Sequence, residues 1–436
     1  MSAEGYSHYT PMKTADAVMD PTLSLYQLLD PAVLADPYPL FRRLREHDPV
    51  HWDPFLHAWI VTGYHDVITV LHRFSADRIR TPEQLSGLGC DGLNPIARVM
   101  LKQLLFMDAP GHTRLRSLAA SAFSPSRVDQ MRVHIHEIAD SLIDGILKKN
   151  CGRMDVIADF AEPFPAIVTA EMLGVPVSDH LQLKDWSADF AEMLGNLQHN
   201  GEKAPRLLRS LEDMTQYFRA AVHEKEKRPT GGLIYSLMTA EVDGGRLTEE
   251  EVVANSILTM IGGQETTTNL IGNGLLTLLR HPDQMAKLTA DLSLVNSAVE
   301  EMLRCEPPVQ HTARIAPDDV VLGGKNIGKG QSVIAVLAAG SRDPERFPDP
   351  DRFDIERKDN RHLAFGWASH FCFGAPLARM EGQIAFSKLL GKLSDIRLGS
   401  EALEWRENLG LRGLRALPIR FQPVATGVEE TLLTVG

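Results

Sequence analysis

The sequence contains few cysteines: Cys90, Cys151, Cys305 and Cys372 are the only four in 436 residues. They form no Cys-x-x-Cys pair and no zinc-ligand spacing, and their scatter does not indicate a disulfide framework. This usage excludes a small secreted scaffold held together by disulfides and favours a reducing compartment. We therefore expect a cytoplasmic protein.

The chain also lacks long hydrophobic runs and an excess of basic residues. Residues 1–30 contain Asp, Glu, Lys and Pro, with no apolar stretch long enough for a signal peptide or a membrane anchor. The formal net charge is -12, which argues against nucleic acid as a partner. We expect neither a membrane nor a nucleic acid to be involved.

No linker divides the sequence, because it has no Pro/Ser/Gly-rich tract, charge block, low-complexity run or internal repeat. Length alone would allow two or three average domains. With 44% hydrophobic residues the chain can bury a large core, so we predict one unit over residues 1–436. We expect residues 1–30 and 424–436 to be loosely ordered termini.

Hydrophobic periodicity predicts a fold that is mainly α-helical with small β-sheets (α+β). Helices are expected over 37–46, 66–72 and most of 113–227, and strands over 51–52, 58–62, 320–322 and 332–337, with the strands at 51–52 and 58–62 paired.

Two segments are candidates for lids over a site. Residues 79–104 are rich in Gly and Pro, which predicts an irregular segment that is either a flexible lid or poorly ordered. Residues 188–206 form either a second lid or an ordinary helix–loop–helix.

The longest predicted helix begins after Thr248, where Glu251 completes a capping box, and runs to about Arg280. At about 1.5 Å per residue it would be roughly 48 Å long. It is apolar on most faces, so it should pass through the centre of the protein. Gly262 and Gly263 interrupt it, each costing about 1 kcal/mol of helix stability, and we expect a kink or a widened turn there.

Cys372 is the most informative residue. It lies in the sequence Phe-Gly-Trp-Ala-Ser-His-Phe-Cys-Phe-Gly (residues 365–374), just before a predicted helix. The N–H groups and dipole at a helix start favour a thiolate, which can be a nucleophile with His370 as base, a redox thiol or a metal ligand. The alternative without a chemical role is that Cys372 is a small residue of the hydrophobic core. The surrounding aromatic and small residues suit a flat apolar object such as haem, for which thiolate is a known axial ligand.

This segment resembles the haem-ligand loop of the cytochrome P-450 family, Phe-Gly-x-Gly-x-His-x-Cys-x-Gly followed by an alanine–arginine helix. The resemblance implies the cytochrome P-450 fold, with haem b between the long helix and this loop, Cys372 as the axial iron ligand and Phe365 as a haem contact. The chain departs from the pattern once, at Ala368, where the family has a second glycine. We expect the added methyl group to shift loop geometry slightly, which bears on the tuning of the ligand and not on its identity.

The glycine pair of the long helix resembles the family's small-Gly-x-acid-Thr signature, with Gly262 in the first small position. The resemblance implies that Thr266 hydrogen-bonds bound dioxygen and that Glu265 feeds protons toward it. The alternative is a glycine kept for close helix packing, with Glu265 on a solvated face.

Glu301 and Arg304 lie three apart on one helix face, a common pair that is a weak signal alone. With the Pro-Pro that follows at 307–308, they resemble the family's Glu-x-x-Arg helix. This implies a structural lock behind the haem loop, with Arg352 as its third partner.

Four further residues resemble the family's contacts to the haem propionates: His112, Arg116, Arg314 and His370. His112 and Arg116 are four apart and share a helix face, and arginine suits carboxylates. Taken singly, each is as well explained as an ordinary surface residue.

The resemblance implies a soluble, bacterial-type monooxygenase that inserts one oxygen atom of O2 into a C–H or C=C bond. The sequence carries no flavin or iron–sulfur motif, so electrons would come from a ferredoxin or flavodoxin with an NAD(P)H-dependent reductase, with Arg361 and Arg379 candidates for docking. We expect a monomer. The alternatives are a peroxygenase, an oxidative coupling or cyclisation enzyme, and a non-catalytic haem protein; the Glu265–Thr266 pair disfavours the first and the last.

Candidate substrate-pocket residues suggest a mostly apolar, medium-to-large small molecule, by analogy a secondary metabolite such as a polyketide or terpenoid. Besides the 79–104 segment they are Met193, Leu194, Met260, Gly262, Val309, His311 and Leu411.

Overall fold

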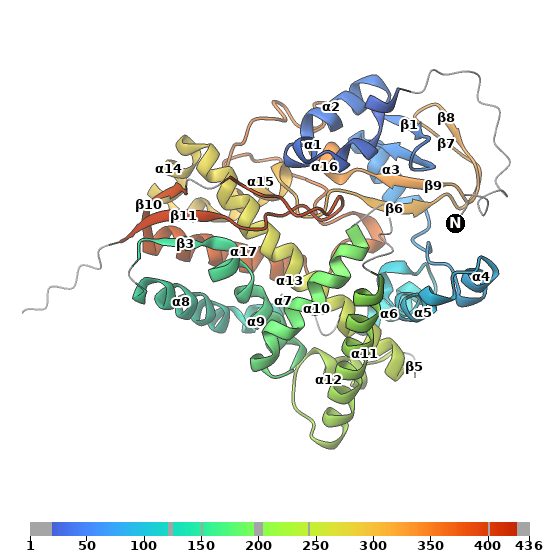
Figure 1. Cartoon of the computed structure of the whole chain (residues 1–436), viewed down its shortest axis with the longest axis horizontal. Coiled ribbons are helices and arrows are strands. Elements are labelled where there is room, and N and C mark those ends of the chain that lie inside the picture. Colours follow the sequence, from blue (N-terminus) through green and yellow to red (C-terminus); the bar gives the residue numbers. More distant parts are fainter. Residues whose placement is uncertain are drawn as a thin grey trace, which may run out of the picture.

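The computed structural model describes residues 20–120, 125–149, 151–195, 204–242, 245–399 and 402–424. Helices make up most of this part of the chain, and the β-sheets are small and lie at separate places around the helical body (Figure 1). The predicted fold class, mainly α with small sheets, is confirmed.

The α-helices of the described residues are α1 (Pro31–Ala35), α2 (Tyr38–His47), α3 (Tyr64–Arg73), α4 (Pro82–Gly87), α5 (Asn94–Met100), α6 (Gly111–Ala120), α7 (Pro125–Gln130), α8 (Arg132–Lys148), α9 (Pro163–Leu173), α10 (His180–Gly195), α11 (Ala204–Lys227), α12 (Leu233–Thr239), α13 (Glu249–Arg280), α14 (Pro282–Ala290), α15 (Val295–Cys305), α16 (Leu337–Gly340) and α17 (Ala375–Lys392). The shorter turns are the 3-10 helices η1 (Pro21–Leu23), η2 (Leu25–Leu29), η3 (Asp91–Leu93), η4 (Leu104–Phe106), η6 (Val177–Asp179), η7 (Leu292–Leu294) and η8 (Ala368–His370), and the π-helical turn η5 (Ile157–Ala161).

The strands are β1 (Val50–Asp53), β2 (Ala58–Val61), β3 (Arg153–Asp155), β4 (Glu241–Val242), β5 (Gly245–Arg246), β6 (Thr312–Ile315), β7 (Val320–Leu322), β8 (Lys325–Ile327), β9 (Ser332–Ala335), β10 (Leu393–Leu398) and β11 (Pro418–Pro423). They form a four-stranded sheet in the order β1-β2-β9-β6, a three-stranded sheet β10-β11-β3, and the hairpins β4-β5 and β7-β8.

The four-stranded sheet joins the two ends of the sequence. β1 and β2 form an antiparallel hairpin with Val50 opposite Val61, as predicted. β2 then pairs in parallel with β9, placing Trp59 opposite Val333, and β9 pairs antiparallel with β6. Because β6 enters this sheet, the sheet fixes the position of Arg314, one of the predicted site residues.

The helix α13 passes through the middle of the protein, between α9, α10, α11 and α17 (Figure 1). Its N-terminus has the predicted capping box of Thr248 and Glu251, and it ends at Arg280. The predicted interruption at Gly262 and Gly263 is not a break, because α13 stays helical through both. Gly263 packs so closely on α9 that a Cβ there would lie 2.8 Å from Thr169 Oγ1, so tertiary packing overrides the weak helix propensity.

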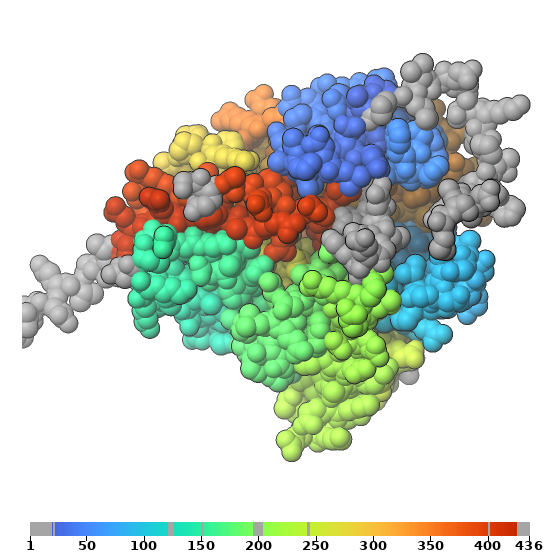
Figure 2. Space-filling model, in the orientation of Figure 1, coloured from blue at the N-terminus to red at the C-terminus, as the bar shows by residue number. Residues whose placement is uncertain are grey.

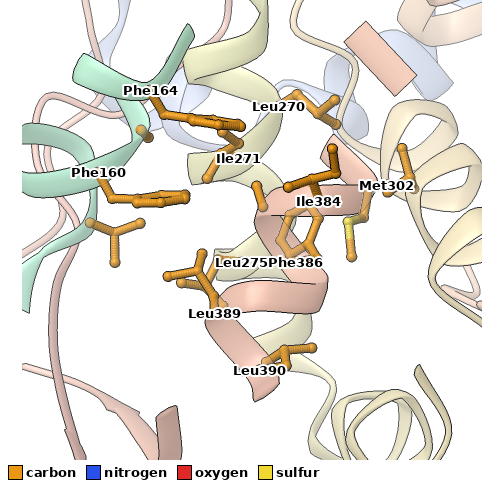
Figure 3. Close-up of a cluster of buried hydrophobic side chains, with 14 of the residues drawn as sticks. Phe160, Phe164, Leu270, Ile271, Leu275, Met302, Ile384, Phe386, Leu389 and Leu390 are labelled. Atoms are coloured by element: carbon orange, nitrogen blue, oxygen red, sulfur yellow. The ribbon is translucent and has the colours of Figure 1, made fainter. Parts of the chain in front are cut away.

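The largest core cluster forms where α13 meets α17 and η5–α9. Figure 3 shows Phe160 and Phe164 facing Ile271 of α13, with Ile384 and Phe386 of α17 beside Met302. The Phe160 and Phe164 rings stack with centroids 5.3 Å apart. This packing fixes the position of α13, which carries Thr266, relative to α17, which follows Cys372 in the sequence.

Some expectations about order differ from the structure. Residues 79–104 are not irregular, because they form α4, η3 and α5; a Thr81 capping box and Pro82 at the first turn start α4. Residues 20–30, expected to be loose, form η1 and η2 with Leu25 and Leu28 buried.

Other expectations fall outside the described residues. The segment between α10 and α11, residues 196–203, is not described, nor are residues 1–19 and 425–436. The lid proposed around 188–206 therefore stays a prediction.

The first and last parts of the described chain lie against each other (Figure 2). Arg412 donates from Nη1 to the Leu34 carbonyl at 2.6 Å and from Nη2 to the Ala35 carbonyl at 2.9 Å.

Within the described ranges, no helix is both long enough and apolar enough to cross a membrane.

Candidate active site

A cavity of about 300 Å³ lies where α13 meets the segment that carries Cys372. The α13 residues that line it are Leu258, Thr259, Gly262, Gly263, Thr266, Thr267 and Leu270. The loop between Ala364 and Gly374 contributes Phe365, His370, Phe371, Cys372 and Phe373, among others. Most of the lining is apolar, as expected for a small-molecule site.

Cys372 is held at the start of α17 by a tight loop. The Cys372 N–H donates to the Phe365 carbonyl at 2.9 Å, and the Cys372 carbonyl accepts from the Ala375 N–H at 3.3 Å. We predicted that the helix start would favour a thiolate, and backbone N–H groups of Gly374 and Ala375 do act in that direction. Burial outweighs them and raises the pKa of the thiol, so a thiolate here needs a further positive charge, such as a bound metal ion.

The one departure from the family loop pattern has a clear backbone consequence. Ala368 adopts φ +56°, the left-handed region that favours glycine. Its carbonyl accepts a hydrogen bond from the Phe371 N–H at 3.1 Å, within the turn η8. The loop therefore keeps a glycine-like shape with an alanine in it.

One edge of the cavity gathers positive and imidazole groups from three distant segments. The His112 and His370 rings lie with centroids 4.1 Å apart, and Arg116 Nη2 donates to the Phe371 carbonyl at 2.6 Å. Arg314 reaches the same cavity from β6. Burial lowers the pKa of both histidines, that of His370 to about 3, so both rings are neutral N–H donors near neutral pH.

This edge is suited to acidic groups that the chain itself does not provide. Within the described residues, the buried His112 Nε2 and Arg314 Nε atoms have no hydrogen-bond partner. Such atoms are costly unless a ligand satisfies them. An apolar cavity with a cysteine thiol and an edge of unpaired donors matches haem, an apolar macrocycle with two propionates.

Thr266 and Glu265 are neighbours in sequence, but their side chains point to different surroundings. Thr266 lines the cavity, and its Oγ1 donates to the Gly262 carbonyl at 2.6 Å. Glu265 is buried but is not among the cavity-lining residues; Arg406 Nη1 donates to its Oε2 at 2.8 Å. Arg406 also pairs with Glu162 at 2.6 Å, and Lys184 lies 3.0 Å from the same carboxylate.

The electrostatics of Glu265 reflect two opposing effects. Burial raises the pKa of Glu265, and the nearby Arg406 works against this shift. The alternative that Glu265 lies on a solvated face is wrong, since its side chain is buried in an ion-pair network.

The family model of cytochrome P450 (cytochrome P-450) matches residues 93–394 of the chain. The chain belongs to the cytochrome P-450 family. It is accordingly a monooxygenase whose cofactor is haem, bound in this family through a cysteine thiolate.

Named relatives cover almost the whole chain. The chain is 39% identical to the cytochrome P-450 monooxygenase PikC of Streptomyces venezuelae over 399 residues, 89% of this chain and 92% of that protein. Among solved structures, P-450 BioI in complex with an acyl carrier protein ligated to hexadec-9Z-enoic acid has a TM-score of 0.84 at 34% identity, covering 90% of this chain and 99% of that one. The myxobacterial CYP267B1 in complex with myristic acid has a TM-score of 0.83 at 38% identity, covering 91% and 99%.

The cytochrome P-450 Glu-x-x-Arg pair is fully buried in α15. Arg304 donates to both oxygens of Glu301 at 2.8 Å, and further to the carbonyls of Ser341, Pro350 and Arg352. The arginine ties the helix to the irregular segment that leads to the Cys372 loop.

The third partner of this lock is Arg357, not Arg352. The Arg357 Nε lies 3.2 Å from Glu301 Oε1, whereas the Arg352 side chain is 62% exposed and, among the described residues, forms an ion pair with Asp354 alone. Arg352 contributes its backbone carbonyl alone. The segment from 349 to 357 is irregular, so side-chain direction there follows no repeat that the sequence reveals.

Two of the seven residues named for the substrate pocket, Gly262 and Val309, line the cavity. The other five are not among the described residues that line it: Met193, Leu194, Met260, His311 and Leu411. Met260, Met193, Leu194 and Leu411 pack instead in or against a neighbouring core cluster. Burial lowers the pKa of His311 to about 4, and its Nε2 has no partner among the described residues.

Glu381 is a cavity residue to which the sequence analysis gave no role. It lies in α17, is 1% exposed and lines the cavity, with Oε1 unpartnered among the described residues. Burial raises the pKa of Glu381 to about 8, while a hydrogen bond with Thr267 acts in the opposite direction. Its spacing of four from Leu377 and three from Ile384 places it on the buried helix face, a signal that the sequence did contain.

The two arginines considered for docking a redox partner differ. Arg379 is bound to Glu300 by two hydrogen bonds of 2.7 and 2.8 Å and stacks on Phe365 at 4.6 Å. Arg361 is exposed, with Asp359 at 3.8 Å. Arg361 is thus the more available of the two.

Proposed function

We propose that Cys372 is the axial thiolate ligand of the haem and that the reaction takes place in the cavity between α13 and the Cys372 loop. The observation that carries this proposal is that Cys372 and Thr266 line the same cavity, although they lie in different elements. With a thiolate ligand, haem supplies dioxygen activation and the insertion of one oxygen atom into a C–H or C=C bond.

The edge of the cavity would hold the haem propionates. Arg116 and Arg314 are suited to carboxylates, and the neutral His112 and His370 rings can each donate an N–H. The unpartnered His112 Nε2 and Arg314 Nε atoms support this assignment, because propionate oxygens would satisfy them.

Thr266 and Glu265 would control protons during the reaction. The Thr266 hydroxyl holds a proton at the cavity wall, where it can hydrogen-bond dioxygen. Glu265 would pass protons toward Thr266. For this its carboxylate has to leave Arg406 and either bind a water molecule or turn toward Thr266. This demand for oxygen-linked protons favours a dioxygen-dependent monooxygenase over a peroxygenase.

The substrate would be a mostly apolar small molecule of medium to large size. The apolar lining of the cavity supports this, with Leu104, Leu105, Leu258 and Val309 among the residues that exclude water. The named relatives include a polyketide-biosynthesis cytochrome P-450, PksS, so a secondary metabolite such as a polyketide or terpenoid is the class we propose.

We further propose that the chain works as a single folded unit and a monomer in the cytoplasm. Electrons would come from a ferredoxin or flavodoxin with its NAD(P)H-dependent reductase, docked on the side of the Cys372 loop near the exposed Arg361 and Phe371.

The absorption difference spectrum of the reduced protein with carbon monoxide tests the ligand assignment. The wild type should show the strongly red-shifted Soret band of haem with a thiolate opposite the gas. Cys372→Ala should lose that band and all monooxygenase turnover, whereas the control Cys90→Ala, at an exposed cysteine, should keep both. A Cys372→Ala variant that retains the band and the turnover would overturn the proposal.

A further inference from the structure

Arg78 is a half-buried cation to which none of the sequence motifs assigns a role. The segment before it is anchored on two sides. Ser75 exchanges two backbone hydrogen bonds of 2.9 Å with Ile315 at the end of β6. The Asp108 carboxylate accepts from the Ala76 N–H at 2.9 Å and from the Ser75 hydroxyl at 2.5 Å. Arg78 is therefore fixed close to β6 and to the start of α6.

The guanidinium of Arg78 is positioned but not neutralised. Its Cζ lies 4.5 Å from the centre of the Phe106 ring, and Nη1 donates to the Ala76 carbonyl at 3.2 Å. An arginine has five N–H donors in a planar fork, and stacking on an aromatic ring holds the fork in place. Among the described residues, no carboxylate lies within ion-pair distance of Arg78.

A second cation, Arg314, lies near enough to repel Arg78, because Ser75 is bonded to Ile315, the residue that follows Arg314. Arg314 is 3% exposed, and its Nη1 donates to Thr312 Oγ1 at 3.1 Å and to the Ala313 carbonyl at 2.8 Å. Its buried Nε has no partner, and none of the described acidic side chains forms an ion pair with it. Asp108 is near, but its oxygens are engaged by Ser75 and Ala76.

Two partly or fully buried guanidinium groups next to each other are unfavourable without an anion. Burial and the charge of Arg314 together lower the pKa of Arg78 to about 9, and burial lowers the pKa of Arg314 to about 10. Both groups still carry a positive charge near neutral pH. The chain thus holds two charged guanidinium groups close enough to repel each other, and of the two only Arg314 is among the described residues that line the cavity.

We propose that Arg78 acts with Arg314 as a carboxylate-binding pair. The carboxylate comes either from a haem propionate or from the acid group of an organic substrate, and both sources share the chemistry that a paired guanidinium fork recognises. This inference rests on the proposed function, because Arg314 lines the cavity that would hold both haem and substrate.

The first measurement separates the propionate source. Haem transfer from the holoenzyme to excess apomyoglobin is followed for the wild type, Arg78→Gln, Arg78→Lys and the control Arg80→Gln, which changes an exposed arginine two residues away. If Arg78 binds a propionate, Arg78→Gln should lose haem about tenfold faster or more, as expected for a charge-assisted hydrogen bond. Arg78→Lys keeps the charge without the planar fork, so it should show a smaller change in the same direction.

The second measurement separates the substrate source. The spin-state change of the holoenzyme is titrated with myristic acid and with 1-tetradecanol, which has the same chain without the acid. If Arg78 binds a substrate carboxylate, Arg78→Gln should weaken the acid about tenfold or more and leave the alcohol unchanged. Arg80→Gln should affect neither ligand.

The outcomes distinguish a haem propionate from a substrate carboxylate, and one set of outcomes rules out a carboxylate site at Arg78. A change in either measurement supports the pair and identifies the source of the carboxylate. If Arg78→Gln and Arg78→Lys match the wild type in haem transfer and acid binding, or if myristic acid does not bind the wild type and haem transfer is unchanged, Arg78 is not part of a carboxylate site. A wild type without the thiolate-type carbon monoxide spectrum would instead disprove the proposed function, independently of Arg78.

Discussion

Replacing Ala368 by glycine should stabilise the protein, although the change only removes a methyl group. Ala368 has φ +56° in the loop that carries Cys372. An L side chain in this region costs about 1–2 kcal/mol. Glycine removes that strain, but it lowers the free energy of unfolding by about 0.4–1 kcal/mol because the unfolded chain gains conformational freedom. The net expectation is a gain of about 0.5–1 kcal/mol.

The same substitution in an ordinary helix provides the control. Ala286 is exposed in the middle of α14, where glycine should cost about 1 kcal/mol. With an unfolding entropy near 2.1 cal/mol/K per residue over 436 residues, 1 kcal/mol corresponds to about 1 °C in Tm. Scanning calorimetry of the holoenzymes should therefore place Ala368→Gly about 1 °C above the wild type and Ala286→Gly about 1 °C below it.

The spectrum should not change with the stability. The turn is held by the hydrogen bonds from the Phe371 N–H to the Ala368 carbonyl and from the Cys372 N–H to the Phe365 carbonyl, which glycine retains. We expect the Soret band of the carbon monoxide complex to stay within error of the wild type. If Ala368→Gly lowers Tm as much as Ala286→Gly does, the argument from backbone strain is wrong.

Three further predictions concern a carboxylate, a lock and a hydroxyl. Burial raises the pKa of Glu381 to about 8 in the folded protein from an ordinary value of 4.5, so the free energy of unfolding should fall by up to about 5 kcal/mol as the pH rises from 4.5 to 8. In urea unfolding, Glu381→Gln should remove most of this fall. A variant with the same pH profile as the wild type would contradict the raised pKa. Arg357→Ala should cost about 2 kcal/mol by removing a partner of the buried Glu301, whereas Arg352→Ala should cost less than about 0.5 kcal/mol; equal urea midpoints would refute the assignment. The Thr266→Ala variant should consume reductant while releasing peroxide instead of product. The control is Thr268→Ala, because the Thr268 hydroxyl donates to the Ala161 carbonyl and Thr268 is not among the described residues that line the cavity; this variant should stay coupled. Equal peroxide yields from the two variants would remove Thr266 from the proton route.

The features that the sequence predicted well are those that depend on local order. The capping box at Thr248, the β1–β2 hairpin and the position of Cys372 before α17 each depend on residues within a few positions of one another. Turn and capping chemistry is local, so these features could be read without knowing the fold.

The orientation of side chains on α13 could not be predicted in the same way. Successive residues of a helix differ in direction by about 100°, so Thr266 faces the cavity while Glu265 turns to Arg406. Because α13 is buried on nearly all sides, it has no polar face to indicate which residues line the cavity. The same rotation places Gly262 in the lining and Met260 in the neighbouring core.

The partners of buried charges were also beyond the sequence. Arg406 reaches Glu265 from 141 positions away, and nothing near either residue announces the pair. Arg352 and Arg357 are equally plausible partners for Glu301 by composition, and only the path of the irregular segment between them selects Arg357. Glu381, by contrast, could have been recognised from helical spacing as a charge on a buried face.

The parallel pairing of β2 with β9 sets an order of events during synthesis. Trp59 finds its neighbour Val333 only after about 270 further residues have been made. Until then the free edge of β2 is an unpaired strand that can recruit other chains. Contacts this distant in sequence slow folding. His112, Arg314 and Cys372 span a stretch of similar length that ends still later in the chain, so the candidate haem site is complete only when nearly all of the chain has left the ribosome. Efficient production in a foreign host should accordingly depend more on slow translation and chaperones at low temperature than on the supply of haem early in synthesis.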